Sequence, residues 1–167
     1  MKLSACVIVK NEEKNLPRWL HCMQELADEI IIVDTWSTDR TVEIAQQAGA
    51  QVYTFVWRDD FAAAKNYAID QATGDWILFL DADEFFVSDV ARRVRPFLQD
   101  FQQKWMVAGF ISPLANIDQK KPEQVLGYCY QVRIFRREKS IRYHGRIHEL
   151  LVNSDKEKGS REFRLTD

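Results

Sequence analysis

Apolar runs alternate with helix-like segments through the first half of the chain. We expect strands where Val, Ile, Leu or Phe follow one another with few polar interruptions. The predicted strands are residues 4–9, 29–33, 51–55 and 76–80. Continuous apolar runs are typical of strands that are buried on both faces. The regular alternation with helices predicts parallel strands that are joined by crossover helices.

The segments between these strands carry residues that can begin or end a helix. The predicted N-caps are Asn15, Ser37 or Thr38, and Asp60. Their side-chain oxygens can accept hydrogen bonds from the free amides of a first helical turn. Gly49 and Gly74 are expected to end the second and third helices.

The second half of the sequence has a different order of elements. Apolar spacing over residues 90–101 predicts one more helix, which Pro96 should bend or break. Three predicted strands then follow without helices between them, at residues 106–112, 128–135 and 141–147. The sequence therefore predicts an α/β fold with a Rossmann-like, mostly parallel sheet, helices on both faces and antiparallel additions in the C-terminal half.

The composition is that of one soluble globular domain. The chain has 167 residues, of which 46% are hydrophobic and 29% are charged, and its formal net charge is -2. A chain without a basic excess is not expected to bind nucleic acid. Cys6, Cys22 and Cys129 lack metal-binding spacing and are expected to be reduced thiols. The first apolar run is too short for a signal peptide or a membrane span, so we expect a cytoplasmic protein.

The segment ILFLDADEFF places acids directly after a predicted buried strand. Asp81 and Asp83 flank one small residue, and Glu84 follows. Ligands of open sheets bind at the carboxyl ends of the strands. Two such close carboxylates repel each other unless a cation lies between them, and Mg²⁺ or Mn²⁺ prefers oxygen ligands. We favour a cation site that carries substrate phosphates over the alternative, an exposed acidic turn.

Two further residues lie near the same predicted edge of the sheet. Asp34 follows the second strand, where it can accept hydrogen bonds from a ribose or a base, or cap the next helix. We favour ligand contact. Lys65 lies inside the third helix, where it either offsets a phosphate charge or is a solvated lysine, and the sequence leaves both interpretations open.

The segment YHGRIHELL carries the last cluster of candidate site residues. In a strand over residues 141–147, His144 and Arg146 would share one side, and His148 would continue it. A neutral histidine can bind a metal, and Glu149 can act as a general base. The alternative for each histidine is a packed or solvated strand residue.

Five stretches in this order resemble a known family. They are KNEEKN (residues 10–15), DTWSTDRT (34–41), DDFAAAKN (59–66), TGDWILFLDADE (73–84) and GRIHE (145–149). Together they are similar to the motifs of the family 2 inverting glycosyltransferases, which have the GT-A fold. The similarity is greatest to a bacterial subgroup with KNEE, D-x-GSTDRT, LDADE and G-x-IHE motifs.

The resemblance implies a function and a division of the chain. It implies transfer of a sugar, with inversion, from a nucleotide-sugar donor, UDP-linked in most of the family, to an acceptor hydroxyl. One domain over residues 1–167 would have a nucleotide-binding half, 1–87, and an acceptor-side half, 88–167. Members of this subgroup usually continue after G-x-IHE, so the acceptor-side half is expected to be short. The acceptor is expected to be a cell-surface glycan, a lipid-linked glycan or a peptide, with peripheral membrane contact left open.

The resemblance also implies roles for individual residues. The expected nucleotide-sugar contacts are Val9, Asn11, Glu12, Asp34, Trp36, Lys65, Asp81 and Ala82. Asp81, Asp83 and His148 would hold Mn²⁺ or Mg²⁺. Glu149 is the first candidate for the base that deprotonates the acceptor, and Asp83 and Glu84 compete with it.

Two residues depart from the family pattern. Trp36 stands where glycine is usual, so it narrows the nucleotide pocket, stacks on the base or turns outward. Lys65 stands where arginine is usual, which keeps the charge but loses the bidentate geometry.

Other functions remain as alternatives. One is a module that binds nucleotide-sugar without turnover. A D-x-D phosphohydrolase is less consistent with the sequence, because three predicted strands precede the motif. A nucleotidyltransferase would need a glycine- and arginine-rich loop after the first strand, and residues 10–15 do not contain one.

Overall fold

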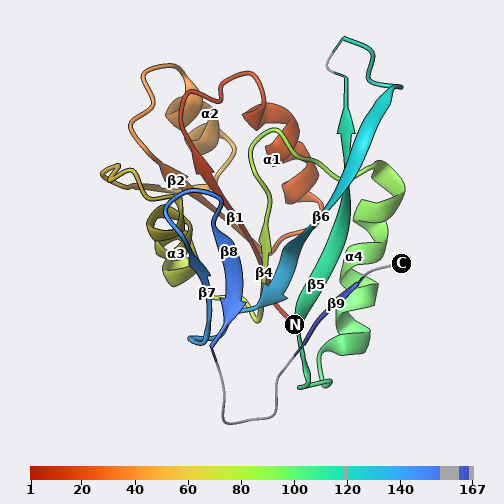
Figure 1. Ribbon diagram of the computed structural model, residues 1–167. Helices are drawn as coiled ribbons and strands as arrows, with labels where there is room; N and C mark the ends of the chain where they lie inside the picture. The colour runs from red at the N-terminus through yellow and green to blue at the C-terminus, as the bar shows by residue number, and fades with distance from the viewer. Residues whose placement is uncertain (119, 155–161, 166–167) are drawn as a thin grey trace.

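A seven-stranded mixed sheet forms the centre of the protein (Figure 1). The computed structural model describes residues 1–118, 120–154 and 162–165. The helices are α1 (Leu16–Gln24), α2 (Thr41–Gln47), α3 (Phe61–Gln71) and α4 (Ser88–Phe101). The strands are β1 (Leu3–Val9), β2 (Glu29–Asp34), β3 (Gln51–Thr54), β4 (Trp76–Phe79), β5 (Val107–Ile117), β6 (Val125–Arg136), β7 (Ile141–His144), β8 (Leu150–Asn153) and β9 (Glu162–Leu165). The strand order of the large sheet is β3-β2-β1-β4-β6-β5-β9, and β7 and β8 form a separate ribbon.

The first four strands are parallel and their carboxyl ends meet at one edge. Val9 at the end of β1 pairs with Asp34 at the end of β2, and Cys6 pairs with Phe79 at the end of β4. Strand β6 runs antiparallel to β4, with Ile134 opposite Leu78. The predicted fold is therefore confirmed: an α/β, mostly parallel sheet with antiparallel additions in the C-terminal half.

Helices cover both faces of this sheet. One apolar cluster joins α1, α2 and α4 to alternate residues of β1, such as Ala5 and Val7. The other joins α3 and β7 to Cys6 of β1 and Phe79 of β4. Figure 1 shows the β7–β8 ribbon in front of the sheet and α4 behind β5 and β6. Burial on both faces explains why the central strands are apolar at consecutive positions.

The helix starts agree only in part with the sequence prediction. Asp60 caps α3, because its carboxylate accepts a hydrogen bond from the amide of Ala63 at 2.9 Å. Asn15 occupies the N-cap position of α1 but makes no side-chain cap. Its Nδ2 donates instead to Glu12 Oε2 at 2.8 Å.

The predicted cap of α2 at Ser37 or Thr38 is wrong. The helix begins at Thr41, after an N-cap at Arg40. Ser37 and Thr38 are used by the loop after β1: Asn11 N donates to Ser37 Oγ at 2.9 Å, and Thr38 N donates to Asn11 Oδ1 at 2.7 Å. A contact between two loops therefore replaces the local cap.

In the second half, one prediction is tested in part and one needs correction. Helix α4 does not break at Pro96, which lies inside its single span, and a bend at Pro96 stays a prediction. Strand β7 ends at His144 and does not continue to residue 147. Gly145 has a φ of 102° and His148 a φ of 56°, so the chain turns before β8. The two histidines therefore do not lie on one face of a strand.

The hairpin of β5 and β6 is longer than the sequence predicts. Strand β5 extends to Ile117, and residues 121–124 lie in the exposed loop before β6. Figure 1 shows the far end of this hairpin projecting beyond the sheet. No helix in the described part of the chain is long and apolar enough to cross a membrane.

Glu29 connects the start of β2 to two neighbouring segments. Its carboxylate accepts hydrogen bonds from Lys2 Nζ at 2.8 Å, Ser4 Oγ at 2.5 Å and Thr73 N at 2.6 Å. Burial raises the pKa of Glu29, but these hydrogen bonds outweigh burial and lower the pKa from 4.5 to about 2. A carboxyl whose pKa is lowered by folding stabilises the native state above its unfolded pKa. This contribution is lost as the pH falls from 4.5 towards about 2.

We predict that Glu29→Gln lowers the free energy of unfolding at pH 7 by about 1–3 kcal/mol, because charge-assisted hydrogen bonds are lost. The variant should also lose part of the stability change between pH 4.5 and about 2. Denaturant unfolding across this pH range measures both effects. Glu25→Gln, at an exposed position, is the control and should change little. Equal pH dependence in wild type and Glu29→Gln would contradict the assignment.

Candidate active site

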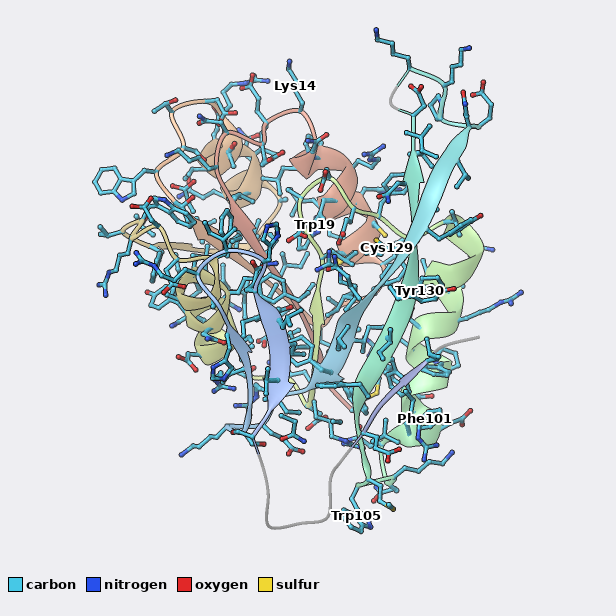
Figure 2. The ribbon with its side chains drawn as sticks, in the orientation of Figure 1. Lys14, Trp19, Phe101, Trp105, Cys129 and Tyr130 are labelled. Atoms are coloured by element: carbon cyan, nitrogen blue, oxygen red, sulfur yellow. The ribbon has the colours of Figure 1, made fainter. Side chains whose placement is uncertain are left out.

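A cleft of about 920 Å³ opens at the carboxyl ends of the parallel strands. Its walls come from the residues after β1 and β4, from α3, from β6, and from the segment that leads into β8. Figure 2 shows Tyr130, one of the lining residues, on β6 beside this opening. The cleft lies at the edge of the sheet where ligands of open α/β sheets bind.

Most of the residues expected in the site lie in the cleft wall. The lining includes Val9, Glu12, Lys65, Asp81, Ala82, Asp83, His148 and Glu149. Asn11, Asp34 and Trp36 lie outside this lining. Glu84 is not part of the lining but contacts Arg133, which is. His144 is an exposed residue at the end of β7.

Asp81 lies between two buried cations. Lys65 Nζ is 3.1 Å from Asp81 Oδ1, and Arg133 Nη2 is 2.9 Å from Asp81 Oδ2. Lys65 and Arg133 are only 4% and 2% exposed. Burial raises the pKa of Asp81, but the charges of Lys65 and Arg133 outweigh it and bring the pKa below its usual value. Asp81 is therefore an ionised carboxylate with a cation on each oxygen.

Two glutamates complete this cluster of charges. Glu149 Oε1 lies 2.6 Å from Lys65 Nζ, and Glu84 Oε1 is in contact with Arg133 Nη2. Lys65 is thus a buried ion-pairing residue, which excludes the alternative of a solvated helix lysine. Burial raises the pKa of Glu84 above its usual value although Arg133 opposes the shift. Glu84 therefore holds a proton more readily than an exposed glutamate.

Sequence reasoning missed Arg133. The only signal was a charged residue inside an apolar part of a predicted strand, between Val132 and Ile134. A buried arginine in such a position needs an acidic partner, but the strand pattern alone does not say which acid lies opposite it. Tyr143 and Trp57 also line the cleft and were not predicted.

The third and fifth motifs hold each other in place. Asn66 of α3 exchanges two hydrogen bonds with the backbone of Tyr143, at 2.8 and 2.9 Å. Arg146 donates to the carbonyls of Arg58 and Asp59 at 3.1 and 3.2 Å. The segment that carries His148 and Glu149 is therefore fixed to the start of α3, far from it in sequence.

Asp83 and His148 are two of the exposed polar groups of the cleft. Both side chains are exposed and line its wall. The described residues contain no group of three or more His, Cys, Asp or Glu side chains that could hold a metal by itself. Mg²⁺ and its analogues are usually bound through one or two carboxylates together with substrate phosphates. That Asp83 and His148 hold a cation which arrives with a diphosphate stays a prediction.

Asp34 stabilises the loop after β2. Its carboxylate accepts hydrogen bonds from the amides of Trp36 at 3.1 Å and Ser37 at 3.2 Å. Glu12 N donates to Thr41 Oγ1 at 2.7 Å, so the loops after β1 and β2 are joined. Asp34 is 5% exposed, and its ligand contact stays a prediction.

Trp36 has a left-handed backbone conformation with a φ of 71°. This conformation favours glycine, which explains why the similar motifs have glycine there. The side chain is 61% exposed and lies outside the cleft lining. The exposed side chain does not narrow the cleft, and the nucleotide contact of Trp36 stays a prediction.

Comparison with known proteins identifies the family. The model of the Glycosyl transferase family 2 matches residues 4–148. A TPR repeat-containing protein of Synechococcus elongatus is 38% identical over 153 residues, which cover 92% of this chain and 36% of that protein. The glycosyltransferase SunS of Bacillus phage SPbeta is 30% identical over 154 residues, which cover 88% of this chain and 34% of SunS. The chain thus spans about a third of the length of these curated relatives.

Solved structures show the same fold. Residues 1–349 of TarS from S. aureus align with a TM-score of 0.55 and 22% identity, over 71% of this chain and 36% of that one. The glucosyl-3-phosphoglycerate synthase of M. tuberculosis aligns with a TM-score of 0.55 and 21% identity, over 66% of this chain and 44% of that one. The class of protein is therefore an α/β domain with the GT-A glycosyltransferase fold. More specifically, the chain belongs to the Glycosyl transferase family 2.

We predict that Trp36→Gly raises the free energy of unfolding by about 1 kcal/mol, because a left-handed conformation strains a residue with a Cβ. Thermal or denaturant unfolding measures the change. Trp105→Gly is the matched control, since Trp105 is 54% exposed and has no positive φ. Figure 2 shows it at the lower end of the molecule. A loss of stability in Trp36→Gly that equals the loss in the control would show that the backbone is not strained.

Proposed function

We propose that this domain transfers a sugar from a UDP-linked donor to a hydroxyl of a cell-surface or lipid-linked glycan, with inversion and with a divalent cation. The observation that carries the proposal is the position of Asp81 and Asp83 in a cleft that also holds Lys65, Arg133 and Glu149. Family membership supports sugar transfer. The fold neighbours support the donor class, because TarS was crystallised with UDP-GlcNAc.

The cation would be held by Asp83 and His148 on the open side of the cleft, next to Asp81. A structure of the mycobacterial synthase contains Mn²⁺ and UDP, which supports Mn²⁺ or Mg²⁺ here. When bound, such a cation offsets the negative charge that the diphosphate gains as it leaves. Asp81, already neutralised by Lys65 and Arg133, would keep the turn that carries Asp83 in position.

The nucleotide would lie along the ends of β1 and β2. Val9, Glu12 and Ala82 line the cleft there, while Asn11 and Asp34 form the loops at its border. The hydrogen bonds of Asp34 stabilise the loop after β2. A base or ribose would meet that loop. Trp36 would not narrow the cleft, because its side chain is exposed and lies outside the lining.

Glu149 is the favoured base for the acceptor hydroxyl. It lines the cleft, and its Oε1 lies 2.6 Å from Lys65 Nζ, which fixes the position of the carboxylate. Glu84 is less suitable, because it contacts Arg133 and accepts a hydrogen bond from Asp81 N at 3.0 Å. Asp83 would be engaged with the cation. A single displacement with one base leaves no covalent intermediate, so attack from the opposite face inverts the sugar carbon.

We predict that Asp83→Asn weakens the enhancement of UDP binding by Mn²⁺ by about tenfold or more, since an amide is a poorer ligand for a hard cation. Titration calorimetry with UDP, with and without Mn²⁺, measures the enhancement. Asp100→Asn, at an exposed position of α4, is the control and should bind like wild type. Unchanged enhancement in Asp83→Asn would remove Asp83 from the cation site.

We predict that Glu149→Gln lowers transfer, or donor hydrolysis, by about 10²–10⁴-fold while the affinity for UDP changes little, because general-base catalysis contributes in this range. A screen of UDP-sugars that detects released UDP gives the rate, and calorimetry gives the affinity. A full rate in the variant would assign the base to another residue. Wild type that binds donor but releases no UDP with any acceptor would instead indicate a nucleotide-sugar-binding module.

A further inference from the structure

Asp81 and Glu84 are the two ends of a tight turn. Glu84 N donates to Asp81 O at 3.0 Å, which closes the turn, and Asp81 N donates to Glu84 Oε2 at 3.0 Å. Ala82 is buried and Asp83 is exposed in the middle of the turn. Asp83 therefore faces the cleft from the apex of a turn whose conformation depends on its two ends.

One guanidinium holds both ends of this turn. Arg133 Nη2 lies 2.9 Å from Asp81 Oδ2 and also contacts Glu84 Oε1. The antiparallel pairing of β6 with β4 sets this contact, since Ile134 is opposite Leu78 and Arg133 is the next residue towards the cleft. Lys65 holds the other oxygen of Asp81 from α3. The turn is thus fixed from two different elements of the fold.

Burial of Arg133 contributes little to the stability of the core. Its side chain is buried, and Nε has no hydrogen-bond partner among the described residues. A buried donor without a partner is unfavourable, and apolar residues often replace buried ion pairs without loss of stability. A role in the geometry of the site accounts for the arginine better than a contribution to stability does.

We propose that Arg133 is a positioning residue for the cation site: by holding Asp81 and Glu84 together, it fixes the turn that presents Asp83. This inference rests on the proposed function, because it concerns the cation that accompanies the donor diphosphate. Arg133 acts through the turn and does not itself touch the cation. A lysine at the same place keeps one positive charge but has a shorter reach, so its ammonium group cannot occupy the position from which Nη2 meets both carboxylates.

The test compares Arg133→Lys with the same substitution at a half-buried arginine of the same strand. Arg136 donates hydrogen bonds to the carbonyls of Val107 and Phe101, remote from the turn, so Arg136→Lys is the control. The measured quantity is the ratio of UDP affinities with and without Mn²⁺, taken on protein whose fold is checked by circular dichroism. We expect Arg133→Lys to reduce this ratio by about tenfold and Arg136→Lys to leave it unchanged, even where both variants lower the melting temperature.

A second variant keeps the test decisive where Arg133→Lys does not fold. Glu84→Gln leaves the arginine in place and weakens its second contact, and it should reduce the Mn²⁺ enhancement in the same direction. When both single variants can be measured, the double variant should also be made. On a free-energy scale it should lose less of the Mn²⁺ enhancement than the sum of the two single losses, because both substitutions break one shared arrangement.

The outcomes separate this inference from the proposed function. If Mn²⁺ enhances UDP binding by the wild-type protein and the enhancement is complete in Arg133→Lys or Glu84→Gln, the role of Arg133 is overturned and the proposed function stands. If Mn²⁺ does not enhance UDP binding by the wild-type protein, the role of Arg133 and the proposed function are both overturned. Equal losses of enhancement in Arg133→Lys and Arg136→Lys would also overturn the inference, since they would indicate a general effect of stability.

Discussion

The ionised carboxylate of Asp81, held between Lys65 and Arg133, is the contact on which the geometry of the cleft depends. An unpaired buried charge is strongly unfavourable, so each of the two cations requires an acid within reach. Asp81 meets this requirement for both, and Glu149 and Glu84 each pair with one of them. These ion pairs connect four parts of the chain: α3, the end of β4, β6 and the segment before β8.

The loops around this cluster carry the backbone strain of the protein. Within the described residues, the non-glycine residues with positive φ are Asn11, Trp36, Asp59 and His148. Each lies in a loop that follows β1, β2, β3 or β7 and borders the site. Such conformations cost energy and persist where surrounding contacts hold them. Here the holding contacts include the bonds between Asn11 and Thr38, and those between Arg146 and the backbone near Asp59.

Family membership and these local contacts explain different aspects of the protein. The match to the Glycosyl transferase family 2 accounts for the order of the elements. The contacts account for how this chain accommodates its departures from the usual motifs. Trp36 keeps the left-handed conformation that glycine would adopt more easily, and its indole remains in solvent. Lys65 takes the place of an arginine and still reaches two acids, because a single ammonium group between Asp81 and Glu149 is sufficient.

The sequence by itself determined the parallel half of the sheet, the cap at Asp60 and the acids at the strand ends. These features follow from apolar runs and from residues whose local preference is strong, so nearby sequence is enough to predict them. The cap at Ser37 or Thr38 and the strand over residues 141–147 were wrong, because a contact with Asn11 and a turn at Gly145 override local preference. Only the tertiary structure decided that Arg133 lies opposite Asp81 and that Lys65 is buried. Those pairs join residues 52 and 16 positions apart in sequence, and the register of β6 against β4 and the packing of α3 bring them together.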